Sequence, residues 1–138
     1  DDVLEEYRKT RDMSAENTGM VLRLALSYGA RRELLRAAQS IARLAVAEGL
    51  DAALALEEED LRRFLYDPSM GDPDLLIRTA GEMRISNFLL WQVSYSEIYV
   101  TDVLWPEFRE PALHAAFSAF AKRKRRFGGR PEEEDSNG

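Results

Sequence analysis

An apolar stretch that runs straight into a charged loop is the feature that most constrains this chain. Leu75 to Ile77 reads as a buried strand, and Arg78 follows it directly. The loop after it carries Arg84, and Ser86 stands where a new helix is expected to begin. In open parallel sheets, ligands gather at the carboxyl ends of strands, and a helix N-terminus at that place attracts anions. The sequence therefore predicts an anion site directly after this strand.

Predicted strands alternate with predicted helices along the chain. Apolar periodicity and turn residues predict helices over 1–13, 31–48, 56–66, 87–95 and from Pro111 onward, and strands over 20–28, 75–78 and 97–100. This alternation is typical of an α/β protein with a central parallel sheet surrounded by helices.

The composition limits the kind of protein. A chain of 138 residues with 45% apolar content suits one domain with a real core. The net charge of -6 argues against a general nucleic-acid binder, and the lack of cysteine excludes disulfides and thiolate metal sites. No apolar run approaches the roughly 20 residues that span a bilayer. We expect a soluble, cytoplasmic protein, with contact to a membrane surface left open.

Arg78, Arg84 and Ser86 suit a phosphate or diphosphate. Guanidinium groups bind phosphate oxygens in a fork and keep their charge at any working pH. The alternative is surface ion pairing beside a plain serine N-cap, with Glu82 either positioning an arginine or facing water. Glu97 starts the next strand and lies level with this loop if the two strands are neighbours. A carboxylate near a diphosphate most simply holds Mg²⁺; the alternative is an exposed glutamate at a strand start.

The segment over 72–108 closely resembles the cis-prenyltransferases, in particular the bacterial undecaprenyl diphosphate synthases. Three runs carry the resemblance: LIRTAGEMRISNFLLWQ over 76–92, YSE over 95–97 and TDVLWP over 101–106. Weaker family segments lie at 17–19 and 27–31, and 125–129 resembles the C-terminal ending of the family. The resemblance implies an incomplete synthase-like fold, in which 1–129 is the C-terminal part of a single catalytic domain. The acidic run over 132–135 separately predicts a disordered tail over 130–138.

The resemblance also implies a reaction and a set of ligands. Members join isopentenyl diphosphate to an allylic diphosphate, usually farnesyl diphosphate, and bacterial members make the long-chain cis-polyprenyl carrier for cell-wall synthesis. By resemblance, Arg78, Arg84, Ile85 and Ser86 bind the isopentenyl diphosphate headgroup and Glu97 binds Mg²⁺. The family further implies a homodimer whose C-terminal region contributes to the neighbouring site, and peripheral membrane contact during release of the lipid product.

Departures from the family pattern leave alternatives open. The catalytic aspartate of the family lies in an upstream H-x-G-N-x-R-W type loop that these residues lack, so we expect the chain alone to be inactive. Four positions carry a residue that is less common in the family: Ser27, Ala30, Ala80 and Met83. The main alternative is a non-catalytic partner subunit of a heteromeric cis-prenyltransferase, although retention of all the expected ligands favours the enzyme. A generic phosphate- or nucleotide-binding module is disfavoured by the lack of a glycine-rich phosphate loop.

Overall fold

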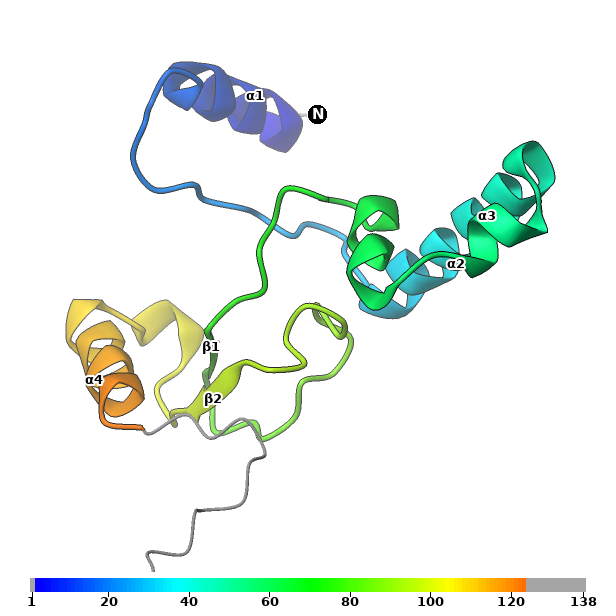
Figure 1. The fold of residues 1–138 in the computed structure, drawn as a ribbon. Helices are drawn as coiled ribbons and strands as arrows, with labels where there is room; N and C mark the ends of the chain where they lie inside the picture. Colours follow the sequence, from blue (N-terminus) through cyan, green and yellow to red (C-terminus); the bar gives the residue numbers. More distant parts are fainter. Residues whose placement is uncertain (1, 124–138) are drawn as a thin grey trace, which may run out of the picture.

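A two-stranded parallel sheet lies at the centre of the computed structural model, which describes residues 2–123 (Figure 1). Strand β1 (Leu75–Arg78) pairs with β2 (Glu97–Val100), with the first residues of the two strands opposite each other and the last residues likewise. The strands predicted over 75–78 and 97–100 and the parallel α/β class are confirmed. The predicted tail over 130–138 and the family-like segment over 125–129 lie outside the described residues.

Helices precede and follow this sheet along the chain. Their bounds are α1 (Asp2–Ser14), α2 (Ala30–Glu48), α3 (Leu50–Leu54), η1 (Glu58–Phe64), η2 (Trp105–Glu107) and α4 (Glu110–Ala121), where η marks a 3₁₀ helix. Helix α2 packs against α3 and η1, and α4 packs against β2. In Figure 1, α2 and α3 form one arm, α4 lies at the other end, and α1 stands apart. The helices predicted over 1–13, over 31–48 and from Pro111 are confirmed, whereas the one predicted over 56–66 is the shorter η1. None of the helices within residues 2–123 combines the length and the apolar character needed to cross a membrane.

Local sequence explains where these helices begin and end. Gly49 ends α2 with a φ of 103°, and its N–H donates to the carbonyl of Ala45 over 3.1 Å. Glycine adopts positive φ without a steric penalty, which suits a helix stop. Pro111 lies in the first turn of α4, where its missing N–H costs nothing.

A buried carboxylate ties three separate segments together. Glu33 of α2 is 2% exposed and accepts hydrogen bonds from the Tyr28 hydroxyl, the Tyr66 backbone N–H (2.9 Å) and Nε2 of Gln92 (3.3 Å). Burial, followed by the bond to Glu33, raises the pKa of the Tyr28 hydroxyl. The rings of Tyr28 and Tyr66 meet edge to face with centroids 6.1 Å apart. Glu33 therefore fixes α2 against the chain that precedes it, the end of η1 and the turns before β2.

Two predicted elements are not formed. Residues 20–28, predicted as a strand, have no regular strand structure, because no neighbouring strand within 2–123 pairs their backbone. Residues 87–95, predicted as a helix, form a series of turns instead. Ser86 and Leu89 have φ angles of 60° and 46°, and this left-handed geometry interrupts a helical hydrogen-bond ladder.

Arg23 anchors the extended segment over 20–28 at one point. Its Nε lies 2.6 Å from Oδ2 of Asp67, and its Nη2 donates to the Ser69 hydroxyl over 3.2 Å. The Ser69 hydroxyl and then the Arg23 guanidinium lower the pKa of Asp67 to about 2. The anchor therefore keeps its charges throughout the neutral pH range.

Replacing Glu33 with alanine is expected to lower the free energy of unfolding by about 2–4 kcal/mol, because buried donors lose their acceptor. Urea denaturation followed by circular dichroism measures the change. Glu48→Ala is the matched control, since Glu48 lies on the same helix and is exposed. Equal effects of the two substitutions would show that the Glu33 contacts do not stabilise the fold.

Candidate diphosphate site

The two arginines predicted to bind an anion converge on one carboxylate. Nη2 of Arg78, at the end of β1, lies 2.6 Å from Oε2 of Glu82. Nη2 of Arg84, in the loop that follows, lies 2.6 Å from Oε1 of the same residue. We refer to these three side chains as the arginine cradle. Glu82 thus pairs with both arginines, which settles the choice left open by the sequence between positioning an arginine and facing water.

The cradle is open to solvent on one side. The Arg84 side chain is 66% exposed, whereas those of Glu82 and Arg78 are 37% and 27% exposed. Nε of Arg78 is buried and has no hydrogen-bond partner among the described residues. A guanidinium carries five donors, so a single carboxylate leaves capacity for a further anion on each arginine. Because partly exposed ion pairs contribute little stability, a diphosphate can displace Glu82 without a large penalty.

Backbone contacts hold the loop of the cradle against the end of β2. The N–H of Ala80 donates to Val103 O over 3.0 Å, and that of Gly81 donates to Thr101 O over 2.9 Å. Gly81 has a φ of 65°, and a Cβ at this position would lie 2.9 Å from Oδ1 of Asp102. A side chain is thus disfavoured at Gly81 both by conformation and by space. The residues after β2 therefore set the path of the loop that leads from Arg78 to Arg84.

Ser86 and Ile85 lie in this loop without the expected helix. Ser86 is exposed, Ile85 is half-buried, and the residues after them form turns. The predicted anion site therefore lacks the helix N-terminus that was expected to support it. Attraction for an anion at the cradle therefore comes from the guanidinium groups and not from a helix dipole.

Asn87 is a structural residue of the site that sequence reasoning missed. Its Oδ1 accepts a hydrogen bond from the Arg31 N–H over 2.8 Å, and its carbonyl accepts from the Ala30 N–H over 3.0 Å. It thus satisfies backbone donors in the first turn of α2. A Cβ on Gly29 would lie 2.8 Å from Nδ2 of Asn87, so glycine permits this close approach. These bonds hold the cradle loop against α2. The sequence signal for this contact was an asparagine, a residue type that often caps helices, directly after Ser86.

Glu97 lies at the opposite end of the sheet from the cradle. It is paired with the first residue of β1, whereas Arg78 is the last residue of that strand. At about 3.3 Å per residue, the two positions are about 10 Å apart along the strands. Oε2 of Glu97 lies 2.5 Å from Nη1 of Arg123, and Nη2 of Arg123 donates to the Ile98 carbonyl over 2.9 Å. The expectation that Glu97 is level with the phosphate loop is therefore wrong within one chain.

Glu97 is not placed to share a metal ion with the cradle of its own chain. Among residues 2–123, no three side chains of His, Asp or Glu gather as metal ligands do. Mg²⁺ is commonly bound by one or two carboxylates together with substrate phosphates. Glu97 is engaged by Arg123 and lies far from the arginines that would hold the phosphates. A metal bridging Glu97 and a diphosphate in the cradle of the same chain does not fit this geometry.

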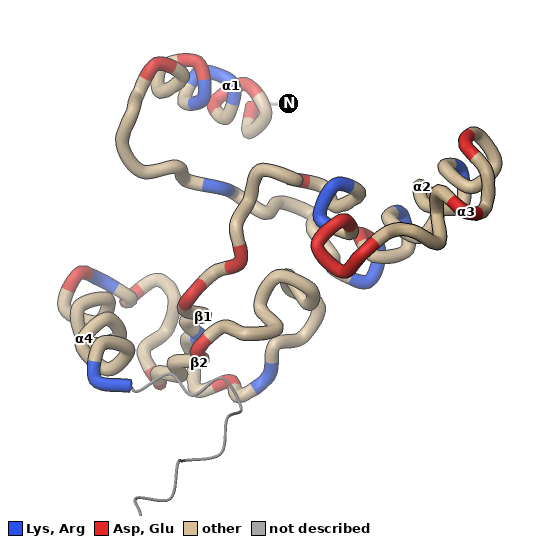
Figure 2. The backbone as a smooth tube through the Cα atoms, viewed as in Figure 1, with Lys and Arg blue, Asp and Glu red and all other residues tan. Residues whose placement is uncertain are grey.

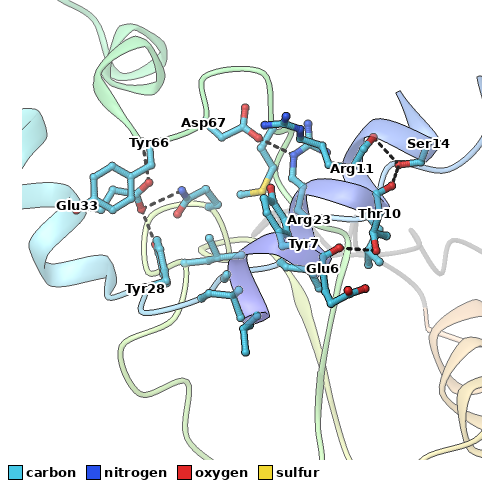
Figure 3. A pocket seen from close by; sticks show the side chains of 18 residues that line it. Glu6, Tyr7, Thr10, Arg11, Ser14, Arg23, Tyr28, Glu33, Tyr66 and Asp67 are labelled. Carbon is cyan, nitrogen blue, oxygen red and sulfur yellow. Dashed lines mark hydrogen bonds and ion pairs between the residues drawn. The ribbon is translucent and has the colours of Figure 1, made fainter. Parts of the chain in front are cut away.

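A cavity of about 690 Å³ lies away from the cradle (Figure 3). Side chains of α1 form one wall, and residues of the extended segment and of the Glu33 cluster form the others. None of the residues predicted to bind substrate or metal lines it. The extended segment over 17–29 carries a single charged residue, Arg23 (Figure 2). The other charged residues that line the cavity are Glu6, Arg11, Glu33 and Asp67.

Comparison with known proteins identifies the family of this chain. A family model described as undecaprenyl diphosphate synthase matches residues 1–128. The chain belongs to this family. It is 49% identical over 127 residues to the isoprenyl transferase of Geobacter sulfurreducens, covering 92% of this chain and 51% of that protein. It is 44% identical over 131 residues to the farnesyl-diphosphate-specific ditrans,polycis-undecaprenyl-diphosphate synthase of Salmonella typhi, covering 95% and 52%. The chain thus spans about half the length of the curated relatives it matches.

Solved structures show the same relationship. Lavandulyl diphosphate synthase from Lavandula x intermedia, in complex with dimethylallyl diphosphate, matches with a TM-score of 0.82 and 35% identity over 91% of this chain and 54% of its own. A probable undecaprenyl diphosphate synthase from Campylobacter jejuni matches with a TM-score of 0.70 and 36% identity, over 94% and 57%. The predicted cis-prenyltransferase resemblance and fold are confirmed.

Replacing Glu82 with glutamine is expected to tighten binding of inorganic pyrophosphate by about five- to tenfold, because an anion that competes for both arginines is removed. This corresponds to about 1–1.4 kcal/mol, the Coulomb energy of one nearby charge in a watery site. Isothermal titration calorimetry on the complete enzyme, meaning this chain joined to the rest of the family fold, measures it. Glu58→Gln on η1 is the control. Weaker binding by the Glu82 variant would show that this carboxylate positions the arginines instead of competing with the ligand.

Proposed function

We propose that this chain provides the isopentenyl diphosphate headgroup site of a cis-prenyltransferase. The complete enzyme would condense isopentenyl diphosphate with an allylic diphosphate, farnesyl diphosphate, to give a long-chain cis-polyprenyl diphosphate for the cell-wall lipid carrier. The observation that carries the proposal is the convergence of two guanidinium groups at the solvent-facing end of β1. Relatives named as isoprenyl transferases, and a solved relative that holds dimethylallyl diphosphate, support the same class of ligand.

Each proposed ligand has a distinct task in this reading. Arg78 is the more buried cation and holds the inner phosphate, while the exposed Arg84 closes over the outer one. The Ser86 hydroxyl donates to a phosphate oxygen, and Ile85 contributes the backbone between Arg84 and Ser86. Glu82 keeps both arginines oriented until the diphosphate replaces it. Charge-assisted bonds of this kind are among the strongest available for fixing a phosphate.

Fixing the headgroup sets the geometry of the reaction. The allylic C–O bond breaks and releases diphosphate, the alkene of isopentenyl diphosphate forms the new C–C bond, and a proton leaves the adjacent carbon. Holding the alkene in line with the allylic carbon lowers the entropic part of the barrier. The same cations also offset the negative charge that builds up in the site as the allylic diphosphate leaves. The groups that activate the allylic diphosphate are not among the residues of this chain.

We propose that Glu97 serves the cradle of a second subunit rather than that of its own chain. Its position at the opposite end of the sheet from Arg78 supports this, since the two cannot meet on one diphosphate within a chain. Mg²⁺ would supply neutralisation of diphosphate charge, and Glu97 would be a carboxylate ligand to it. A symmetric homodimer would then contain two such composite sites. A cytoplasmic location, with contact to the membrane surface during product release, completes the proposal.

The second candidate is a non-catalytic partner subunit of a heteromeric cis-prenyltransferase. Such a subunit would bind the headgroup without the H-x-G-N-x-R-W type loop of the family, which these 138 residues do not contain. Retention of both arginines in one cradle favours the enzyme, because a subunit without substrate has no need of two converging cations.

Replacing Arg84 with alanine is expected to raise the Michaelis constant for isopentenyl diphosphate roughly 10- to 150-fold in the complete enzyme. This range corresponds to the loss of about 1.5–3 kcal/mol from one charge-assisted bond. Steady-state kinetics at saturating farnesyl diphosphate measure the constant. Arg63→Ala is a matched control, because Arg63 is 61% exposed and also paired with a carboxylate. An unchanged constant for the Arg84 variant would refute its assignment to the headgroup.

Mixing the Arg84→Ala and Glu97→Ala homodimers is expected to restore activity that neither variant shows alone. If the two residues act in one site from different subunits, random exchange in an equal mixture leaves about a quarter of the sites intact. Initial rates after subunit exchange measure the recovery. No recovery, with exchange verified by mass spectrometry, would place both residues in the site of one chain or remove Glu97 from the site.

A further inference from the structure

Backbone strain is concentrated in the loop that carries the arginine cradle and in the turns directly after it. Of the four non-glycine residues with positive φ within residues 2–123, three lie over 80–89, at Ala80 (61°), Ser86 (60°) and Leu89 (46°). A side chain in the left-handed region costs conformational energy, so such residues persist only where surrounding contacts hold them. The conformation of Ser86 therefore depends on contacts from outside the loop.

The first turn of α2 provides these contacts. The N-cap of α2 is Gly29, which has no side chain to accept hydrogen bonds from the first N–H groups of the helix. Asn87, directly after Ser86, takes this place from a distant part of the chain. Its Oδ1 accepts from the Arg31 N–H over 2.8 Å, and its carbonyl oxygen accepts from the Ala30 N–H over 3.0 Å. The helix thus obtains the acceptors that a capping residue would supply, and the loop obtains a fixed end.

The turns after Asn87 follow the same part of the chain. The rings of Phe88 and Tyr28 meet edge to face with centroids 5.9 Å apart. Nε2 of Gln92 donates to Glu33 over 3.3 Å, and Figure 3 shows Glu33 bonded to Tyr28 as well. These turns are therefore attached to α2 and the residue before it at three successive points, of which Asn87 is the nearest to the cradle.

Gly29 brings Asn87 close to the start of the helix. A Cβ at Gly29 would lie 2.8 Å from Nδ2 of Asn87. The φ of Gly29 is −156°, an extended conformation that any residue adopts, so glycine is needed here for space and not for conformation. A methyl group at this position would displace the amide that is bonded to the Arg31 N–H. It would do so without changing any residue of the loop.

We propose that Asn87 is a positioning residue of the headgroup site, so that the first turn of α2 controls how tightly the cradle binds a diphosphate. The inference rests on the proposed function, because it concerns the same cradle. The Asn87 side chain does not contact the ligand, since its amide is engaged by the N-terminus of α2. It acts through Ser86, whose left-handed backbone it fixes, and through the path of the chain that leads back to Arg84.

Replacing Asn87 with alanine is expected to raise the Michaelis constant for isopentenyl diphosphate about three- to tenfold in the complete enzyme, as the loss of one hydrogen bond predicts. The Michaelis constant for farnesyl diphosphate is expected to stay unchanged, because Asn87 acts only on the cradle. Ala37→Gly is the matched control, since Ala37 is fully buried on α2 and glycine there weakens the same helix away from the cradle. Equal increases in the control and in Asn87→Ala, or equal increases for both substrates, would overturn the proposal.

Gly29→Ala disturbs the same contact from the helix side and gives a second test if Asn87→Ala does not fold. It is expected to raise the same Michaelis constant. Two substitutions that act through one contact are not additive, so the double variant should show no larger increase than Asn87→Ala alone. Increases that multiply in the double variant would overturn the proposal.

The Arg84→Ala variant, measured alongside, separates this inference from the proposed function. A raised constant for Arg84→Ala with unchanged constants for Asn87→Ala and Gly29→Ala would keep the headgroup assignment and overturn the role of Asn87. An unchanged constant for Arg84→Ala would overturn both.

Discussion

The parallel pairing of β1 with β2 determines where every proposed ligand of this chain lies. Parallel strands in this register bring their carboxyl ends to one edge of the sheet, so the loop after β1 lies beside the residues after β2. Thr101 and Val103 use that closeness to bind the backbone of the loop that carries Arg84. The same pairing sends Glu97 to the opposite edge. One structural constraint thus assembles the arginine cradle and excludes the expected metal ligand from it.

Glu82 gives the two arginines of the cradle a shared counterion. Two guanidinium groups held close together repel each other, and a carboxylate between them offsets that repulsion. The two ion pairs are partly exposed and contribute little stability. Glu82 therefore orients the arginines and can still be displaced from them. The proposed diphosphate site depends on this balance, because deeply buried ion pairs would leave the arginines inaccessible to a ligand.

The sequence predicted local features well and long-range ones poorly. Strand β1 and helix α2 follow from apolar periodicity and from a stop at Gly49, which are properties of neighbouring residues. The identity of the two arginines followed from the family motif, and the structure brings them together. The relation of Glu97 to Arg78 depends on the register between strands, which no run of residues encodes. The helix predicted after Ser86 failed because contacts with α2, made through Asn87, hold the chain in left-handed turns.

The strand predicted over 20–28 failed for a different reason, and that reason is informative. Its composition is that of a buried strand, and composition is what the prediction measured. A strand, however, is a property of a pair, because its backbone groups need a neighbour to bind. The missing strand therefore reflects the lack of a pairing neighbour within residues 2–123. Oε1 of Gln92, beside the same cavity, likewise has no hydrogen-bond partner among these residues. Whether an apolar run becomes a strand is therefore decided by its tertiary environment as well as by its local sequence pattern.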